Sequence, residues 1–193
     1  IERQNKILVD KMTKIIKYLD CNSKIKLKNE LKKYLDCRLK YNIWYMKNLI
    51  VVTGGSGFVG SNLIEYFLKK TKLQIISLDN YSSGSKKNHI LNKRVKYIKS
   101  DTKQISQTLK IYKNRINAIF HFGEFSRIYQ SFNNMNECIE SNLIGSNAVF
   151  NFCMKNNIKL IYSATSASLG NNGRDKNLSP YAFTKSKNLE MLE

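Results

Sequence analysis

Three glycines follow an apolar segment at a spacing that suits phosphate binding. Gly54, Gly57 and Gly60 come directly after the apolar run Leu49–Thr53, and a helical pattern covers residues 57–70. Glycine permits a tight turn and lets the backbone approach a pyrophosphate without a collision from a Cβ atom. The helix after this loop directs its first N–H groups and the positive end of its dipole at that anion. The segment therefore predicts a dinucleotide phosphate site.

A carboxylate is placed where such a site needs one. Asp79 follows the next apolar run, Leu73–Leu78, about 20 residues after Gly60, as in dinucleotide-binding folds. A carboxylate there accepts hydrogen bonds from both hydroxyls of the adenosine ribose and repels a 2′-phosphate. The sequence thus favours NAD over NADP as cofactor. The alternative is that Asp79 is a solvated loop residue.

A tyrosine and a lysine four residues apart form the second chemical pair. Tyr181 and Lys185 share a face if residues 181–185 are helical, and Leu178–Pro180 can start that helix. A neighbouring ammonium favours the phenolate form of a tyrosine, which makes the tyrosine a better general base. Any helix can carry such a pair, so its meaning depends on the elements before it.

Those elements predict an α/β fold with a doubly wound parallel sheet, Rossmann-like. Apolar runs that suit buried parallel strands alternate with helical patterns, which implies right-handed crossovers. The expected strands are Leu49–Thr53, Leu73–Leu78, Val95–Ile98, Ala118–Phe122 and Ile158–Ser163, and a long helix is expected over Met135–Asn156.

The first 45 residues differ from the rest. Residues 1–45 carry only helical patterns and no recognisable chemistry, and Met46 opens a segment typical of the start of an α/β protein. We expect a helical extension at 1–45, as a linker or the tail of another coding unit, and an NAD-binding domain at 46–193. The alternative is a regulatory or dimerising helical hairpin.

The composition excludes several classes of protein. Hydrophobic residues make up 42% of the chain, yet no apolar run suits a membrane span and the first residues resemble no signal peptide. We expect a cytoplasmic protein with no membrane partner. The net charge of +19 comes from lysines spread along the chain, which indicates a compositional bias rather than a nucleic-acid site. The four cysteines are scattered and predict reduced thiols, with no metal site.

Five short segments precede the Tyr-x-x-x-Lys pair in this order: 53–61 (TGGSGFVGS), 78–84 (LDNYSSG), 100–101 (SD), 120–124 (FHFGE) and 142–146 (NLIGS). Together with that pair they resemble the extended short-chain dehydrogenases/reductases, and among them the NAD-dependent sugar-nucleotide epimerases and dehydratases such as UDP-glucose 4-epimerase. The cofactor-binding residues that the resemblance implies are Gly54, Gly57, Phe58, Val59, Gly60, Asp79, Asn80, Ser83, Asp101, Phe122, Gly123, Asn142, Tyr181 and Lys185.

The resemblance also implies a catalytic set of Thr165, Tyr181 and Lys185. In such enzymes the tyrosine takes the proton of the C4 hydroxyl of a nucleotide-linked hexose while NAD accepts the C4 hydride. The lysine holds the nicotinamide ribose, and the threonine hydroxyl positions the sugar oxygen. The resulting ketone is reduced from its other face. Ser163 and Ser166 are the alternatives to Thr165.

The two residues after Thr165 indicate the branch of the family. Dehydratases carry an Asp–Glu pair there, whereas this chain has Ser166 and Ala167. Elimination of water then lacks its acid and base, which favours an epimerase, most simply a UDP-hexose 4-epimerase, over a 4,6-dehydratase. The chain also departs from the family in having Leu169 where a tyrosine is common and in a short segment between Thr165 and Tyr181.

The family continues with a substrate-binding domain beyond the position of Glu193. We therefore expect this chain to be a fragment that lacks that domain, and the second hypothesis is a non-catalytic NAD-binding module. Relatives dimerise through helices flanking the fourth strand, so Met135–Asn156 is a candidate homodimer surface. His121 is expected to pack beside the cofactor loop, and Glu124 to pair with Arg127 on an exposed helix.

Overall fold

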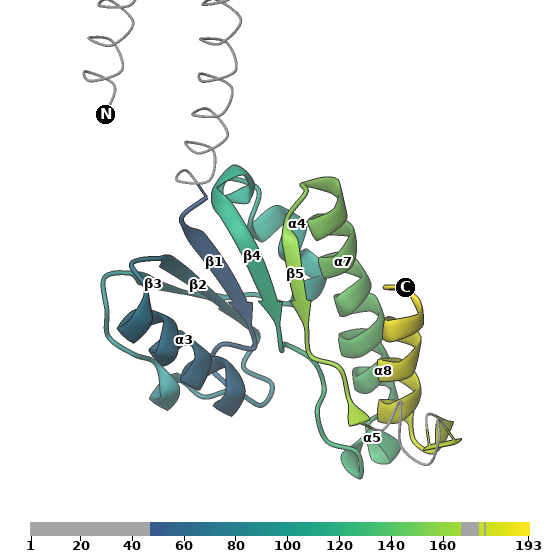
Figure 1. Cartoon of the computed structure of the whole chain (residues 1–193). Coiled ribbons are helices and arrows are strands. Elements are labelled where there is room, and N and C mark those ends of the chain that lie inside the picture. Colours follow the sequence, from purple (N-terminus) through teal and green to yellow (C-terminus); the bar gives the residue numbers. More distant parts are fainter. Residues whose placement is uncertain (1–46, 167–173, 176) are drawn as a thin grey trace, which may run out of the picture. The chain divides into compact units, whose positions relative to one another are not determined.

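The computed structural model describes residues 47–166, 174–175 and 177–193 (Figure 1). The chain divides into two units between Met46 and Lys47, and all the described residues belong to the second unit. The helices predicted for residues 1–45 lie outside the described residues, so the appended segment stays a prediction.

A five-stranded sheet forms the centre of the second unit, with the strand order β3-β2-β1-β4-β5. All neighbouring strands are parallel, which confirms the predicted doubly wound sheet. The strands are β1 (Leu49–Thr53), β2 (Gln74–Asp79), β3 (Val95–Lys99), β4 (Ile116–His121) and β5 (Lys159–Tyr162). The chain builds β1 to β3 on one side and then crosses to β4. The C-terminal ends of β1 and β4 therefore flank the point at which ligands bind in such sheets.

Helices cover both faces of this sheet (Figure 1). The longer ones are α3 (Phe58–Lys70), α7 (Ser146–Lys155) and α8 (Pro180–Glu190), and the shorter ones are α4 (Ile105–Thr108), α5 (Gln130–Asn133) and α6 (Met135–Ile139). Single 3₁₀ turns occur at Lys86–Asn88, Thr102–Gln104 and Lys113–Arg115. Within the described ranges, no helix combines the length and the hydropathy of a membrane span.

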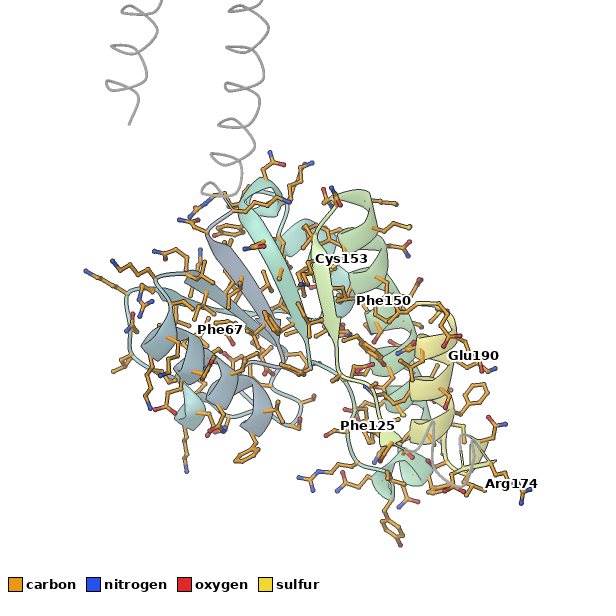
Figure 2. All side chains as sticks on the ribbon, viewed as in Figure 1. Phe67, Phe125, Phe150, Cys153, Arg174 and Glu190 are labelled. Carbon is orange, nitrogen blue, oxygen red and sulfur yellow. The ribbon has the colours of Figure 1, made fainter. Side chains whose placement is uncertain are left out.

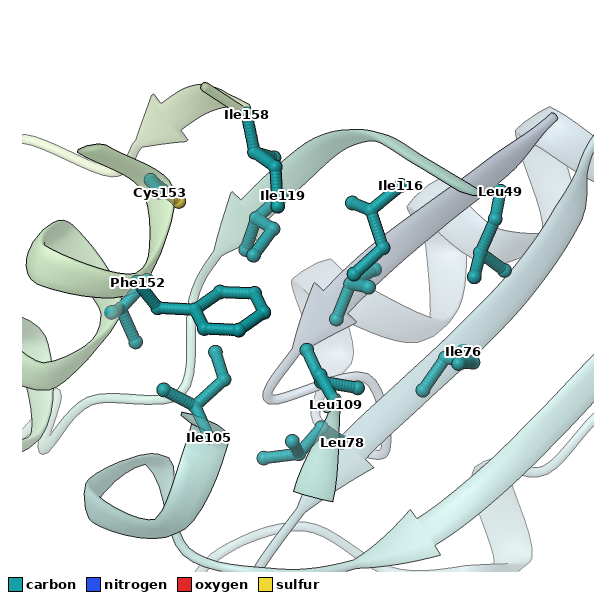
Figure 3. Close-up of a cluster of buried hydrophobic side chains, with 12 residues drawn as sticks. Leu49, Ile76, Leu78, Ile105, Leu109, Ile116, Ile119, Phe152, Cys153 and Ile158 are labelled. Atoms are coloured by element: carbon teal, nitrogen blue, oxygen red, sulfur yellow. The ribbon is translucent and has the colours of Figure 1, made fainter. Parts of the chain in front are cut away.

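Two hydrophobic cores follow from the alternation of side chains along the strands. On β1, Leu49 and Val51 join a cluster with Phe152 of α7, whereas Ile50 and Val52 join one with Ile64 of α3. Figure 3 shows the first cluster, in which the side chains of α4 and α7 meet those of the strands. Phe67 and Phe150, labelled in Figure 2, pack against the second and the first cluster respectively. The helices on both faces are thereby packed against the sheet whose strand ends form the site.

The helix predicted over residues 135–156 is interrupted in an informative way. A π-helical segment, Glu140–Gly145, lies between α6 and α7. At Gly145 a Cβ atom would lie 2.4 Å from the Thr102 hydroxyl oxygen, so the backbone passes very close to the 3₁₀ turn there. Such π segments insert extra residues into a helical run and are frequent at functional sites. Here the segment contains Asn142, which is fully buried.

Candidate functional site

The glycine loop after β1 is built by close backbone contacts. Gly54 has φ +68°, and a Cβ atom on it would lie 2.8 Å from the backbone of both Phe122 and Gly123. A Cβ on Gly60 would lie 2.3 Å from the carbonyl oxygen of Gly54. The loops after β1 and β4 therefore touch, and the first turn of α3 rests on the glycine loop.

The start of α3 is open to a ligand. No side chain caps this helix, and its first intrahelical bond runs from Ser61 N–H to the Gly57 carbonyl at 3.0 Å. The N–H groups of the first turn lack helical partners, and Phe58 and Val59 in that turn are largely exposed. An anion placed there would meet these N–H groups and the positive end of the helix dipole.

Asp79 is held with its carboxylate at the same edge of the sheet. Its Oδ2 accepts from Ser56 N–H at 2.9 Å and its Oδ1 from Tyr81 N–H at 2.8 Å. Each carboxylate oxygen can accept a further hydrogen bond, and Asp79 lines the neighbouring cavity. The carboxylate is thus fixed by two backbone groups while retaining acceptor capacity for ribose hydroxyls.

A cavity of about 510 Å³ joins these parts, a volume within the range of ligand and cofactor sites. The residues predicted to bind cofactor that line it are Gly54, Gly57, Phe58, Val59, Gly60, Asp79, Asn80, Ser83, Phe122 and Gly123. The remaining predicted site residues, Asp101, Asn142, Thr165, Tyr181 and Lys185, are not among those that line it. Most of the predicted adenosine and pyrophosphate contacts are therefore brought together around one cavity.

Two of the remaining residues support the cavity from outside. Asp101 caps a 3₁₀ turn by accepting from Lys103 N–H at 2.9 Å, and it also accepts from the Asn80 side chain at 3.3 Å. Asn142 accepts from Phe125 N–H at 2.7 Å and donates to the Phe125 carbonyl at 3.1 Å. Asn142 thus fixes the loop after β4, which continues from Gly123.

The helix that carries the tyrosine–lysine pair begins as expected. Ser179 caps α8 by accepting from Ala182 N–H at 3.0 Å, and Pro180 occupies its first turn. Tyr181 is half-buried in that first turn, and its N–H donates to the Ser131 hydroxyl at 3.3 Å. Lys185, one turn later, is buried. Thr165 is half-buried in the segment that follows β5.

Lys185 makes a buried ion pair that the sequence analysis missed. Its ammonium donates to Oε2 of Glu124 and to the Ser163 carbonyl, and both side chains of the pair are 4% exposed. The predicted exposed pair of Glu124 with Arg127 is wrong. The segment after β4 forms a turn, with Glu124 N–H donating to the Phe122 carbonyl at 2.9 Å, so Glu124 and Arg127 do not share a helical face.

One signal in the sequence could have revealed this cluster. Tyr181, Thr184, Lys185 and Asn188 recur at helical spacing and so form one polar face in the sequence. The structure buries the last three of them. Asn188 donates to Oε1 of Glu124 at 3.1 Å and to the Tyr162 hydroxyl at 3.0 Å. A buried polar stripe on a helix indicates hydrogen-bonding partners beneath it.

His121 lies fully buried beside the glycine loop. Its Nδ1 is 2.7 Å from the Thr53 hydroxyl and its Nε2 is 2.9 Å from the Ser146 hydroxyl. Burial, reinforced by the charge of Lys185, lowers the pKa of His121 to about 4, although Glu124 opposes the shift. His121 is therefore neutral near pH 7.

This shift predicts a pH dependence of stability. In the unfolded chain His121 binds a proton near pH 6.5, whereas in the folded protein it does so only near pH 4. The free energy of unfolding should fall as the pH drops through this window, by about 3 kcal/mol in total from this residue. Urea unfolding between pH 7.5 and 4 measures the effect. The unmodified chain and His89→Gln should show this pH dependence of the free energy of unfolding, and His121→Gln should lack it. The same pH dependence in all three proteins would contradict the assignment.

The comparisons with known proteins agree with this geometry. The model of the NAD dependent epimerase/dehydratase family matches residues 50–193. The chain belongs to this family. It is 31% identical over 150 residues to an ADP-L-glycero-D-manno-heptose-6-epimerase of Brachyspira hyodysenteriae, covering 71% of this chain and 46% of that protein. It is 28% identical over 137 residues to UDP-glucuronic acid decarboxylase 6 of Arabidopsis thaliana, covering 68% of this chain and 38% of that protein.

Solved structures show the same fold. The UDP-N-acetylglucosamine 4-epimerase of Methanobrevibacter ruminantium is similar with a TM-score of 0.66 and 29% identity, over 76% of this chain and 49% of that one. The UDP-glucose 4-epimerase of Thermotoga maritima has a TM-score of 0.65 and 25% identity, over 75% of this chain and 50% of that one. The chain spans about half the length of these relatives.

The family is NAD-dependent, and the site fits that cofactor. Glycines stand where a Cβ atom would fill the loop, at Gly54 and Gly60. The Asp79 carboxylate lines the same cavity as the start of α3. A ribose and a pyrophosphate thus each find groups of the right chemistry.

Asp79 also provides a test of cofactor selectivity. Replacing Asp79 by alanine removes the ribose acceptors and should weaken NAD binding by about 10- to 100-fold, the usual effect of hydrogen bonds to a charged group. NADP binding should fall less, because the negative charge that repels the 2′-phosphate is also lost. Calorimetry with both cofactors measures the ratio of affinities, with Glu65→Gln as a surface control. An unchanged ratio would show that Asp79 does not select the cofactor.

Proposed function

We propose that this chain is the nucleotide-binding part of a UDP-hexose 4-epimerase that acts by transient oxidation at C4 of the sugar. The observation that carries the proposal is the position of Lys185. Its ammonium contacts Glu124 and Ser163, and both of these residues line the cavity predicted to hold the cofactor. The tyrosine–lysine pair of α8 therefore adjoins the C-terminal ends of β4 and β5.

The roles follow from the chemistry of the side chains. Bound NAD supplies an acceptor and later a donor for the C4 hydride. Tyr181 takes the proton of the C4 hydroxyl and returns it to the product, for which a phenolate beside an ammonium is suited. Lys185 stabilises that phenolate and holds the nicotinamide ribose. The Thr165 hydroxyl orients the sugar oxygen.

The named relatives support a sugar-nucleotide substrate. Two of the solved relatives are 4-epimerases of UDP sugars by name, whereas the two curated relatives named above are a heptose 6-epimerase and a decarboxylase. A 4,6-dehydratase remains the second candidate within the family. Ser166 and Ala167 stand where its elimination needs a carboxylic acid and base, and this favours the epimerase.

A third hypothesis is a module that binds NAD without catalysis, since the chain spans only about half of its relatives. One experiment separates the three. This chain is joined to the C-terminal half of a UDP-glucose 4-epimerase and incubated with UDP-glucose. We expect UDP-galactose; a 4-keto-6-deoxy sugar indicates the dehydratase, and NAD binding with no product indicates the module.

For the surroundings of the protein we propose a cytoplasmic location and a homodimer through residues 135–156, without nucleic-acid or membrane partners. Sedimentation of the chain at several concentrations measures its oligomeric state.

A further inference from the structure

We infer that Glu124 is a positioning residue that holds the ammonium of Lys185 in place for the cofactor. This inference rests on the proposed function, because it takes Lys185 to bind the nicotinamide ribose. It concerns a residue for which the sequence analysis expected only an exposed surface pair.

Glu124 is surrounded by donors. Its Oε2 accepts from Lys185, and its Oε1 accepts from Ser146 at 2.7 Å, from Tyr162 at 2.9 Å and from Asn188 at 3.1 Å. A glutamine cannot replace it without loss. An amide has one oxygen, so either its oxygen faces Lys185 and its NH₂ faces three donors, or the reverse. The site is therefore built for a carboxylate.

The hydrogen bonds around Glu124 have one direction. The Thr53 hydroxyl oxygen accepts from the N–H groups of Phe122 at 3.1 Å and Gly123 at 3.0 Å. Its own proton is thus available for Nδ1 of His121, which leaves the imidazole proton on Nε2. His121 then donates to the Ser146 hydroxyl, and Ser146 donates to Glu124.

This series of hydrogen bonds connects the glycine loop to the catalytic lysine. Thr53 precedes Gly54 directly, and its partner Gly123 also lines the cavity. In each bond of the series the group nearer the glycine loop donates and the group nearer Glu124 accepts. The carboxylate therefore receives a hydrogen bond that stabilises its negative charge in a buried position. Neutral His121, whose pKa burial lowers to about 4, suits this arrangement.

The pair leaves Lys185 ready for one more partner. An ammonium has three N–H groups, and the carboxylate of Glu124 and the carbonyl of Ser163 occupy two of them. The Tyr162 ring lies 4.4 Å from the nitrogen. The third N–H group makes only a long contact, 3.5 Å to the Ser163 hydroxyl, which a cofactor hydroxyl would replace in an orientation that the first two bonds determine.

A double-mutant cycle on the full chain tests this role, with the NAD dissociation constant from calorimetry as the readout. Lys185→Met should raise this constant about tenfold, as expected for a lost charged hydrogen bond. Glu124→Gln should raise it to a similar extent, and the double variant no further, because Glu124 acts through Lys185. Glu137→Gln, which removes an exposed charge on α6, should leave it unchanged.

Thermal unfolding separates positioning from support of the fold. Each single variant leaves a buried group unpaired and should lower Tm by about 10 °C. The double variant should recover much of that loss while NAD affinity stays low. If Glu124→Gln does not fold, Glu124→Asp replaces it, because the shorter side chain keeps the charge. We then expect a smaller rise of the dissociation constant, and the double variant Glu124→Asp/Lys185→Met should bind NAD as weakly as Lys185→Met alone.

The outcomes are distinct. Two results would overturn the positioning role while leaving the proposed function intact. In the first, Glu124→Gln does not change NAD affinity. In the second, its loss of affinity adds in full to the loss caused by Lys185→Met. Unchanged affinity in Lys185→Met overturns the role assigned to the lysine itself, and the inference about Glu124 with it.

Discussion

Replacing Tyr181 by phenylalanine is expected to reduce sugar-nucleotide turnover by about 1,000-fold or more, the effect of losing a general base. The ring that packs in the first turn of α8 is kept, and the backbone bond to Ser131 does not involve the hydroxyl. Tm should therefore change little, and NAD affinity should fall by no more than about tenfold, the effect of losing the one hydrogen bond that the Tyr181 hydroxyl can make to the cofactor. Turnover is measured in the polypeptide that joins this chain to the C-terminal half of a 4-epimerase.

A matched variant controls for the loss of a tyrosine hydroxyl. Tyr129 is 83% exposed, and Tyr129→Phe should retain full turnover. If Tyr181→Phe also retained it, the proton would be taken by another group and the assignment of α8 as the catalytic helix would be wrong.

The second large effect is expected from a single methyl group in the phosphate loop. Gly60→Ala places a Cβ atom 2.3 Å from the Gly54 carbonyl oxygen and 2.7 Å from the Gly55 Cα. Neither backbone atom can move without displacing the loop, so NAD affinity should fall by at least about 100-fold. Such overpacking also destabilises the fold by about 1–3 kcal/mol. Calorimetry and urea unfolding measure the two effects.

Gly57→Ala is the comparison variant in the same loop. Its Cβ would meet only the Gly54 carbonyl oxygen, at 3.3 Å, which a shift of a few tenths of an ångström relieves. We expect NAD affinity within about threefold of the original chain, because little of the overpacking at Gly60 arises there. Equal affinities for both variants would show that the approach of α3 to the loop does not shape the phosphate site.

The sequence was sufficient to predict the sheet and most of the residues that line the cavity beside the glycine loop. Strands buried on both faces are continuous apolar runs, and Leu49–Thr53 was predicted with its observed ends. The positions of Gly54, Gly60 and Asp79 depend on local backbone geometry, which residue type and spacing predict directly. The other predicted strands overlap the observed ones and differ by one or two residues at their ends.

The hydrogen-bond network around Lys185 could not be predicted from such local patterns. Glu124 and Lys185 are far apart in the chain, and their contact depends on the turn after β4 and on the docking of α8. The helix predicted over residues 135–156 was likewise expected to be uniform, whereas the structure has a π segment at Glu140–Gly145, where Gly145 lies close to Thr102. Local patterns encode elements, whereas these features come from packing between elements.

The central claim is that the hydride leaves C4 of the sugar and returns to the same carbon. UDP-glucose labelled with deuterium at C4 tests it in the joined polypeptide, by mass spectrometry of the product in ordinary water. Transient oxidation predicts that UDP-galactose retains the deuterium, because a hydride taken up inside the closed site does not exchange with solvent. Loss of the label to water would contradict this mechanism, since it would show that C4 is inverted by removal of a proton from carbon rather than by transient oxidation.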